Sequence, residues 1–254
     1  MRQTIFSIFF LAFVSFLVAQ DAEPLVWTPD YCMKFKPISG TDLSPDGKYV
    51  AYVVREPIMT EDKSAYLSQI WVAAADGSMD VQYTRNEKSS TNPAFSPDGQ
   101  FIAFMSGRSG KNQVWLMRLM GGEPEQITSE KGGVSNFQWS PDGSKFAFIK
   151  NDGKTAEEEK REKEKSDVIV VDQNFKYGHL YTTTIEKDKD GKRKVQRLTG
   201  GEFHVTQYDW SPDGKQIVFS HKDDPKINTS RIDANISLVS SDSSALKMIV
   251  DRPG

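Results

Sequence analysis

The sequence predicts an all-β protein, a β-propeller of about four four-stranded blades, and three observations predict it. The tetrapeptide SPDG occurs four times, beginning at Ser44, Ser96, Ser140 and Ser211, and each copy lies between short apolar segments. In the second repeat four strand-like segments follow one another, joined by links of hairpin length. Repeats of this size, irregular in period and with four strands each, are typical of propellers.

Each SPDG is expected to be a reverse turn, and the second copy shows why. Pro97 fixes φ at the first central position of a type I turn, and Asp98 tolerates the second. Gly99 takes the position that often needs positive φ, and Ser96 can hydrogen-bond back into the turn. The four aspartates are therefore expected to serve the backbone, although four repeated carboxylates resemble metal ligands.

The strands expected in each repeat follow from the segments around these turns. The second repeat predicts strands at 93–96, 100–106, 113–119 and 125–128, with loops at 107–111 and 120–123. The first repeat predicts strands in 41–54, 69–78 and 81–84. The third predicts them in 136–150 and 180–199, and the fourth in 208–220, 235–241 and 246–250.

The apolar runs favour a propeller over a two-sheet sandwich. The segments FIAF, YVAYVV, KFAFI and QIVFS do not alternate cleanly between apolar and polar residues. A strand inside a blade is covered on both faces by neighbouring blades and should be apolar throughout. A sandwich strand should alternate regularly.

The third repeat contains a charged insertion, residues 154–166. Lys154 to Lys165 holds five acidic and five basic residues and no aliphatic side chain larger than Ala156. The pairs Glu157–Arg161 and Glu159–Lys163 have the i, i+4 spacing of helical ion pairs. We expect a solvated helical or disordered surface insertion; the alternative is a contact or gating element near a substrate path.

The N-terminal residues 1–20 are interpreted as a secretory signal peptide. They combine Arg2, an uncharged, mostly apolar run from Ile5 to Ala19 and a small residue at the end of that run. Cleavage near Ala19 or Gln20 would leave a propeller domain of residues 21–254, exported to the periplasm or the extracellular space and free of the membrane. An uncleaved anchor is the alternative, although the run is short against the roughly 20 residues of a spanning helix.

Charge and cysteine content exclude other classes. The net charge of -3 gives no reason to expect a nucleic-acid partner. Cys32 is the only cysteine, so no internal disulfide can form, and we expect it to be buried as a small apolar residue.

No motif predicts a catalytic, cofactor-binding or metal-binding residue, and none locates a substrate-binding residue. GRSGK (107–111) lacks the spacing of the G-x-S-x-G nucleophile elbow. His179, His204 and His221 have no metal-ligand spacing, and we expect surface or loop positions for them. The D-x-D-G of Asp188–Gly191 lacks the later calcium ligands and is better explained as a hairpin turn.

Three segments carry a resemblance to a known family. Trp27–Val54 resembles the start of the propeller in prolyl oligopeptidase-family serine peptidases, in the acylaminoacyl-peptidase and dipeptidyl-peptidase-like branch. Residues 95–128 look like the second repeat of that propeller, and the insertion followed by 167–184 is similar to the third. SPDG alone also occurs in TolB-like periplasmic propellers.

The resemblance implies a seven- or eight-bladed propeller that restricts short peptides on their way to an α/β-hydrolase domain with a Ser-Asp-His triad. Such enzymes need no metal or organic cofactor. No position here matches the triad, so the four repeats are expected to be inactive alone. The alternative is a non-enzymatic, TolB-like exported propeller that binds a protein partner.

An incomplete set of blades has a physical consequence. A terminal blade would expose ~400 Å² of apolar face, a large patch for a soluble monomer. At roughly 25 cal/mol/Å² this forfeits about 10 kcal/mol, comparable to the stability of an ordinary domain. We therefore expect this chain alone to be marginally stable or prone to aggregation.

Overall fold

The computed structural model describes residues 27–165, 175–223 and 234–251. The chain divides into two compact units, Met1–Lys34 and Phe35–Gly254. The described part of the first contains the helix α1 (Pro29–Lys34), and the second contains every described strand. The predicted signal peptide lies outside the described residues.

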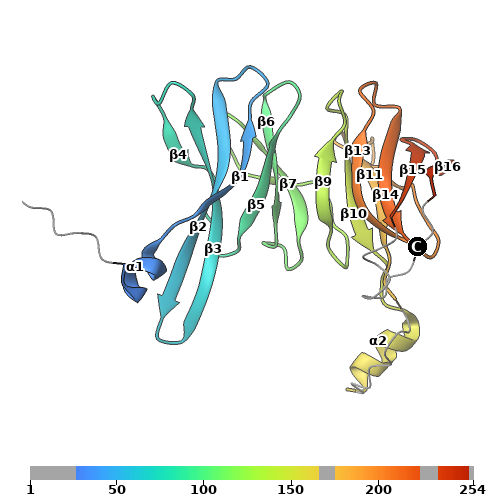
Figure 1. Cartoon of the computed structure of the whole chain (residues 1–254), viewed down its shortest axis with the longest axis horizontal. Coiled ribbons are helices and arrows are strands. Elements are labelled where there is room, and N and C mark those ends of the chain that lie inside the picture. The colour runs from blue at the N-terminus through green and yellow to red at the C-terminus, as the bar shows by residue number, and fades with distance from the viewer. Residues whose placement is uncertain (1–26, 166–174, 224–233, 252–254) are drawn as a thin grey trace, which may run out of the picture. The chain divides into compact units, whose positions relative to one another are not determined.

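The second unit folds as four four-stranded antiparallel sheets, called here blades 1 to 4 (Figure 1). Within each blade the strands pair in chain order, so that every connection joins neighbours. Blade 1 contains β1 (Ile38–Leu43), β2 (Tyr49–Thr60), β3 (Lys63–Ala74) and β4 (Asp80–Gln82), and blade 2 contains β5 (Ser90–Phe95), β6 (Phe101–Ser106), β7 (Gln113–Arg118) and β8 (Glu125–Gln126). Blade 3 contains β9 (Ser135–Trp139), β10 (Lys145–Asn151), β11 (Gly178–Thr184) and β12 (Val195–Arg197), and blade 4 contains β13 (His204–Trp210), β14 (Gln216–Lys222), β15 (Asn235–Ser240) and β16 (Leu246–Val250).

The fold prediction is confirmed, and each SPDG forms the turn between the first two strands of its blade. In blade 2 the Gly99 amide donates to the Ser96 carbonyl over 2.8 Å, and Gly99 has φ +71°. The Ser96 hydroxyl donates to the Asp98 carboxylate over 2.5 Å and accepts from the Phe101 amide over 2.9 Å. The other three copies repeat this pattern, so the aspartates do serve the backbone.

The inner blades are apolar on both faces, as the continuous apolar runs predicted. In β6, Ile102 and Phe104 pack against blade 1, while Ala103 and Met105 pack towards blade 3. The central strand β10 behaves in the same way, with its phenylalanines towards blade 2 and Ala147 and Ile149 towards blade 4. The hydrophobic core of this unit is therefore a series of layers between blades.

Blade 4 differs, because one of its faces is exposed. Residues along β14 alternate, with Ile217 and Phe219 buried against blade 3 and Val218 exposed. Ile236 is exposed on the same face, and the outermost strand β16 exposes Leu246, Met248 and Ile249. The apolar run QIVFS therefore does not indicate burial on both faces here.

The charged insertion forms a helix in its described part, α2 (Ala156–Lys163), which buries no side chain. A capping box starts it: the Glu158 amide donates to the Thr155 hydroxyl, and the Glu158 carboxylate accepts from the Thr155 amide. The predicted Glu157–Arg161 ion pair is present at 2.8 Å. Glu159 instead pairs with Lys131, outside the helix. Residues 166–174 lie outside the described part.

The expectation that Cys32 is buried is wrong. Cys32 lies on the six-residue helix α1 and is exposed, as are the nearby Tyr31 and Phe35. A helix of six residues has no interior of its own. The apolar character of Cys32 therefore did not indicate that its side chain is buried. In the described ranges, no helix has the length and apolar character needed to cross a membrane.

Candidate functional site

All three histidines lie where blade 3 meets blade 4. His179 belongs to β11, His204 to β13 and His221 to β14. The expectation of surface or loop positions is wrong: His179 and His221 are 0% and 4% exposed, and His204 is half-buried in a strand. Blade–blade packing buries them, and a short window of sequence does not reveal such packing.

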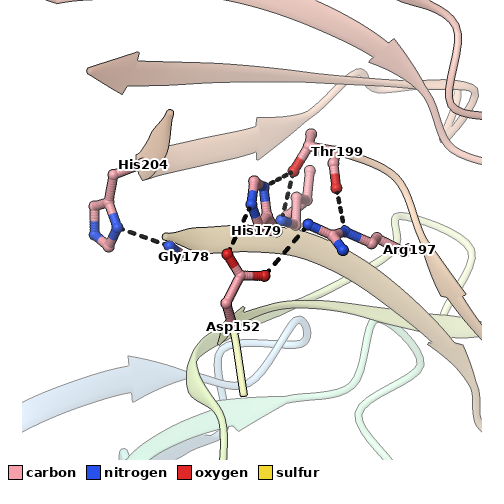
Figure 2. Close-up of polar contacts among 7 residues, drawn as sticks. Asp152, Gly178, His179, Arg197, Thr199 and His204 are labelled. Carbon is pink, nitrogen blue, oxygen red and sulfur yellow. Dashed lines mark hydrogen bonds and ion pairs between the residues drawn. The ribbon is translucent and has the colours of Figure 1, made fainter. Parts of the chain in front are cut away.

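His179 is the centre of a polar cluster (Figure 2). Its Nδ1 lies 3.3 Å from the Thr199 hydroxyl, and its Nε2 lies 3.6 Å from the Asp152 carboxylate. Arg197 approaches the other Asp152 oxygen at 3.4 Å and donates to the Thr199 carbonyl over 2.7 Å. Burial lowers the pKa of His179, and the Arg197 charge lowers it further, so the ring is neutral at pH 7.

Blades 1 and 2 contain the same contact between a threonine hydroxyl and a side chain of the third strand, with glutamine in place of histidine. We call this contact the threonine clamp. The Thr84 hydroxyl donates to Gln69 and accepts from the Ile70 amide, and Thr128 makes the same two bonds with Gln113 and Val114. In blade 3 the Leu180 amide donates to the Thr199 hydroxyl, and His179 takes the glutamine position. His179 thus joins the third strand of its blade to the segment that follows the fourth, and its complete burial keeps it from any substrate.

His221 has a geometry that resembles a catalytic relay. Its Nδ1 lies 3.0 Å from the Asp223 carboxylate, and its Nε2 lies 3.0 Å from the Ser237 hydroxyl. A serine–histidine–aspartate order of this kind activates the nucleophile of serine hydrolases. Ser237, however, is only 4% exposed in the middle of β15, where an acyl substrate has no access. We therefore assign this relay a structural role.

A cavity of about 670 Å³ beneath α2 is lined mostly by charged side chains. Its lysines come from the β6–β7 loop, the β8–β9 link, the end of β10 and the insertion. Its charged lining consists of Lys111, Lys131, Lys150, Lys154, Lys163, Glu159 and Glu162. We call it the lysine pocket. The sequence analysis missed it because its members are scattered over 53 positions of the chain, between Lys111 and Lys163.

The other motifs have the positions expected of them. Residues 107–111 form the β6–β7 loop, with the Gly110 amide donating to the Gly107 carbonyl. Asp188–Gly191 is a turn closed by the Gly191 amide on the Asp188 carbonyl at 2.9 Å. In the part of the chain that is described, no three His, Cys, Asp or Glu side chains are grouped to hold a metal ion.

A family model for the TolB beta propeller domain matches residues 33–179. The chain belongs to the TolB β-propeller family. The match includes blades 1 and 2 and reaches into β11 of blade 3, which agrees with the four sheets described above.

Segments of this TolB-type propeller are also similar to peptidases. It is 40% identical over 75 residues to the uncharacterized peptidase YuxL of Bacillus subtilis (strain 168), covering 29% of this chain and 11% of that protein. It is 36% identical over 86 residues to dipeptidyl-peptidase 5 of Porphyromonas gingivalis, covering 34% and 12%. The resemblance to peptidases is confirmed, and the matched segments span about a tenth of those relatives.

Two solved structures show how widely the fold is shared. TolB from Acinetobacter baumannii aligns with a TM-score of 0.54 at 18% identity, covering 85% of this TolB-type propeller and 44% of that chain. An acylaminoacyl peptidase of Pyrococcus horikoshii aligns with a TM-score of 0.56 at 18% identity, covering 87% and 33%. At this level of identity the likeness concerns the fold alone.

Proposed function

We propose that this chain is the substrate-gating propeller of an exported serine peptidase that hydrolyses short peptides. The observation that carries the proposal is the similarity of its segments to peptidases, including 36% identity to a dipeptidyl-peptidase. The catalytic triad would belong to an α/β-hydrolase domain that partners the propeller. The propeller would admit short peptides, exclude folded proteins and require no cofactor, in the periplasm or the extracellular space.

The described residues agree with this division of roles. His179 is fully buried, and the Ser237–His221–Asp223 relay has no access for a substrate. Peptide hydrolysis would therefore depend on groups outside blades 1 to 4.

The test is active-site labelling of the natural protein with a fluorophosphonate, followed by mapping of the labelled peptide. We expect labelling of a serine outside residues 35–254, and no change in the Ser237→Ala variant. Hydrolysis rates should fall as the peptide substrate lengthens. Labelling of a serine within residues 35–254, or equal cleavage of short peptides and folded proteins, would contradict the proposal.

A second candidate function is a non-enzymatic exported propeller that docks a protein partner. The family match and the likeness to TolB favour it. It predicts that neither labelling nor hydrolysis is detected anywhere in the natural protein, and the same experiment therefore separates the two functions.

A further inference from the structure

The lysine pocket holds more positive than negative charge. Five lysines and two glutamates line it, which leaves an excess of three positive charges in a protein whose net charge is -3. Within the described part of the chain, no carboxylate lies within ion-pair distance of the Lys111 or Lys163 ammonium groups. Two cations at the pocket are thus available to a ligand.

The remaining lysines of the pocket are paired, and one pair joins α2 to the link between blades 2 and 3. Lys131, in the link between blades 2 and 3, contacts Glu159 of α2 at 2.6 Å. This hydrogen bond raises the pKa of Lys131 and lowers that of Glu159, so both groups are charged at pH 7. Lys154 and Glu162 pair within the insertion, and Lys150 pairs with Glu130.

The helix over the pocket is held by ion pairs rather than by a core. It buries no side chain, and the ion pairs Lys131–Glu159 and Lys176–Glu158 join it to residues outside the charged insertion. Exposed ion pairs of this kind stabilise by about 0–1 kcal/mol each. A ligand carboxylate can therefore replace Glu159 on Lys131 without reducing the number of ion pairs.

We propose that the lysine pocket binds a peptide segment carrying several Asp or Glu side chains. A volume of about 670 Å³ is in the range of ligand sites and far exceeds a single small anion. The cations come from separate elements and are point-charge ammonium groups, which suits several spaced carboxylates better than one chelated phosphate. In this arrangement Glu159 is an internal competitor of the ligand. The inference does not depend on the proposed peptidase function.

The test measures binding of two blocked peptides to the full chain by isothermal titration calorimetry. One peptide is N-acetylated, C-amidated tetraglutamate and the other is the matching tetraglutamine. We expect tetraglutamate to bind, with an affinity that falls as salt concentration rises, and tetraglutamine not to bind. Equal binding of both peptides, or inorganic phosphate binding as tightly as tetraglutamate, would overturn the proposal.

Four variants locate the site. Lys111→Gln and Lys163→Gln should each weaken tetraglutamate binding by roughly two- to fivefold, because each removes one ion pair. Glu159→Gln should strengthen it, since Lys131 loses its internal partner. Glu157→Gln is the matched control on the same helix, where Glu157 pairs with Arg161 away from the pocket lining. Unchanged affinity in both lysine variants, or weaker binding in Glu159→Gln, would refute the assignment.

Discussion

A histidine stands at position 179, where blades 1 and 2 carry glutamine, and this exchange changes how the blade responds to acid. The Gln69 and Gln113 side chains accept hydrogen bonds from the threonines of their clamps, and they also donate to the Asn86 and Glu130 carbonyls. His179 keeps the contact to Thr199, but its Nε2 has no hydrogen-bond partner among the described residues.

The pKa direction gives the sign of a pH effect on stability. An unfolded histidine titrates near pH 6.5, and burial lowers the folded pKa of His179 below this value. Asp152, Arg197 and His204 are the charged or titratable groups that face it. As pH falls below about 6.5 the unfolded chain takes up the proton first, so the native state loses free energy of unfolding.

We therefore predict that His179→Gln reduces the loss in free energy of unfolding between about pH 7.5 and about pH 5.5, a range centred on the pKa of an unperturbed histidine. Urea unfolding of parent and variant at both pH values measures it. Some acid sensitivity should remain, because burial and the Lys222 charge also lower the pKa of His204. An equal loss in parent and variant would show that His179 does not titrate as described.

The SPDG turn is the unit that repeats at the scale of elements. Its serine is buried in the first three copies, where it donates to the aspartate and receives the amide of the residue five positions on. The same bond from serine lowers the pKa of Asp46, Asp98, Asp142 and Asp213, with help from a backbone amide. The turn is therefore stabilised by a charged acceptor as well as by backbone geometry.

Removing one serine hydroxyl should destabilise the protein measurably. Ser96→Ala takes the donor from Asp98 and leaves the Phe101 amide without its acceptor, at a cost of about 1–2 kcal/mol in free energy of unfolding. Chemical denaturation at pH 7 measures this cost. Ser243→Ala, at an exposed bend, is the control and should stay within about 0.5 kcal/mol of the parent. Equal stability of the two variants would contradict the role assigned to the turn.

The sequence was informative at this scale wherever local chemistry decides the structure. Turn residues and apolar runs predicted the four sheets, and the charge run predicted an exposed insertion, helical or disordered, in which the structure has the helix α2. The partner of Glu159 was missed because Lys131 lies 28 positions away. The same holds for the lysine pocket and for the buried histidines, which are created by packing between segments that are distant in sequence.

At the scale of the whole molecule, contacts between blades decide which apolar surface is covered. Hydrogen bonds add to the apolar layers: Asp42 accepts from the Phe95 amide, and Trp139 donates to the Ala94 carbonyl. Tyr208 of blade 4 donates to the Ala147 carbonyl of blade 3. The second face of blade 4 has Val218 and Ile236, each 37% exposed.

This exposed face should govern self-association of the chain. We predict that Val218→Lys combined with Ile236→Lys lowers both the binding of an apolar fluorescent dye and light scattering at high protein concentration, several-fold in each case. The free energy of unfolding should change by no more than about 1 kcal/mol per site, since both side chains are partly solvated in strands. Dye fluorescence, static light scattering and urea unfolding measure the three quantities.

The lysine substitutions separate two causes of self-association, the exposed apolar surface and the net charge. The parent has a net charge of -3, so each added lysine moves the protein towards neutrality, which by itself promotes association. Gln216→Lys adds one positive charge at an exposed position of β14, the strand of Val218, without removing apolar surface, and it should leave scattering unchanged or raise it. If the control suppresses scattering as strongly as the double variant, the exposed apolar face of blade 4 is not what drives self-association.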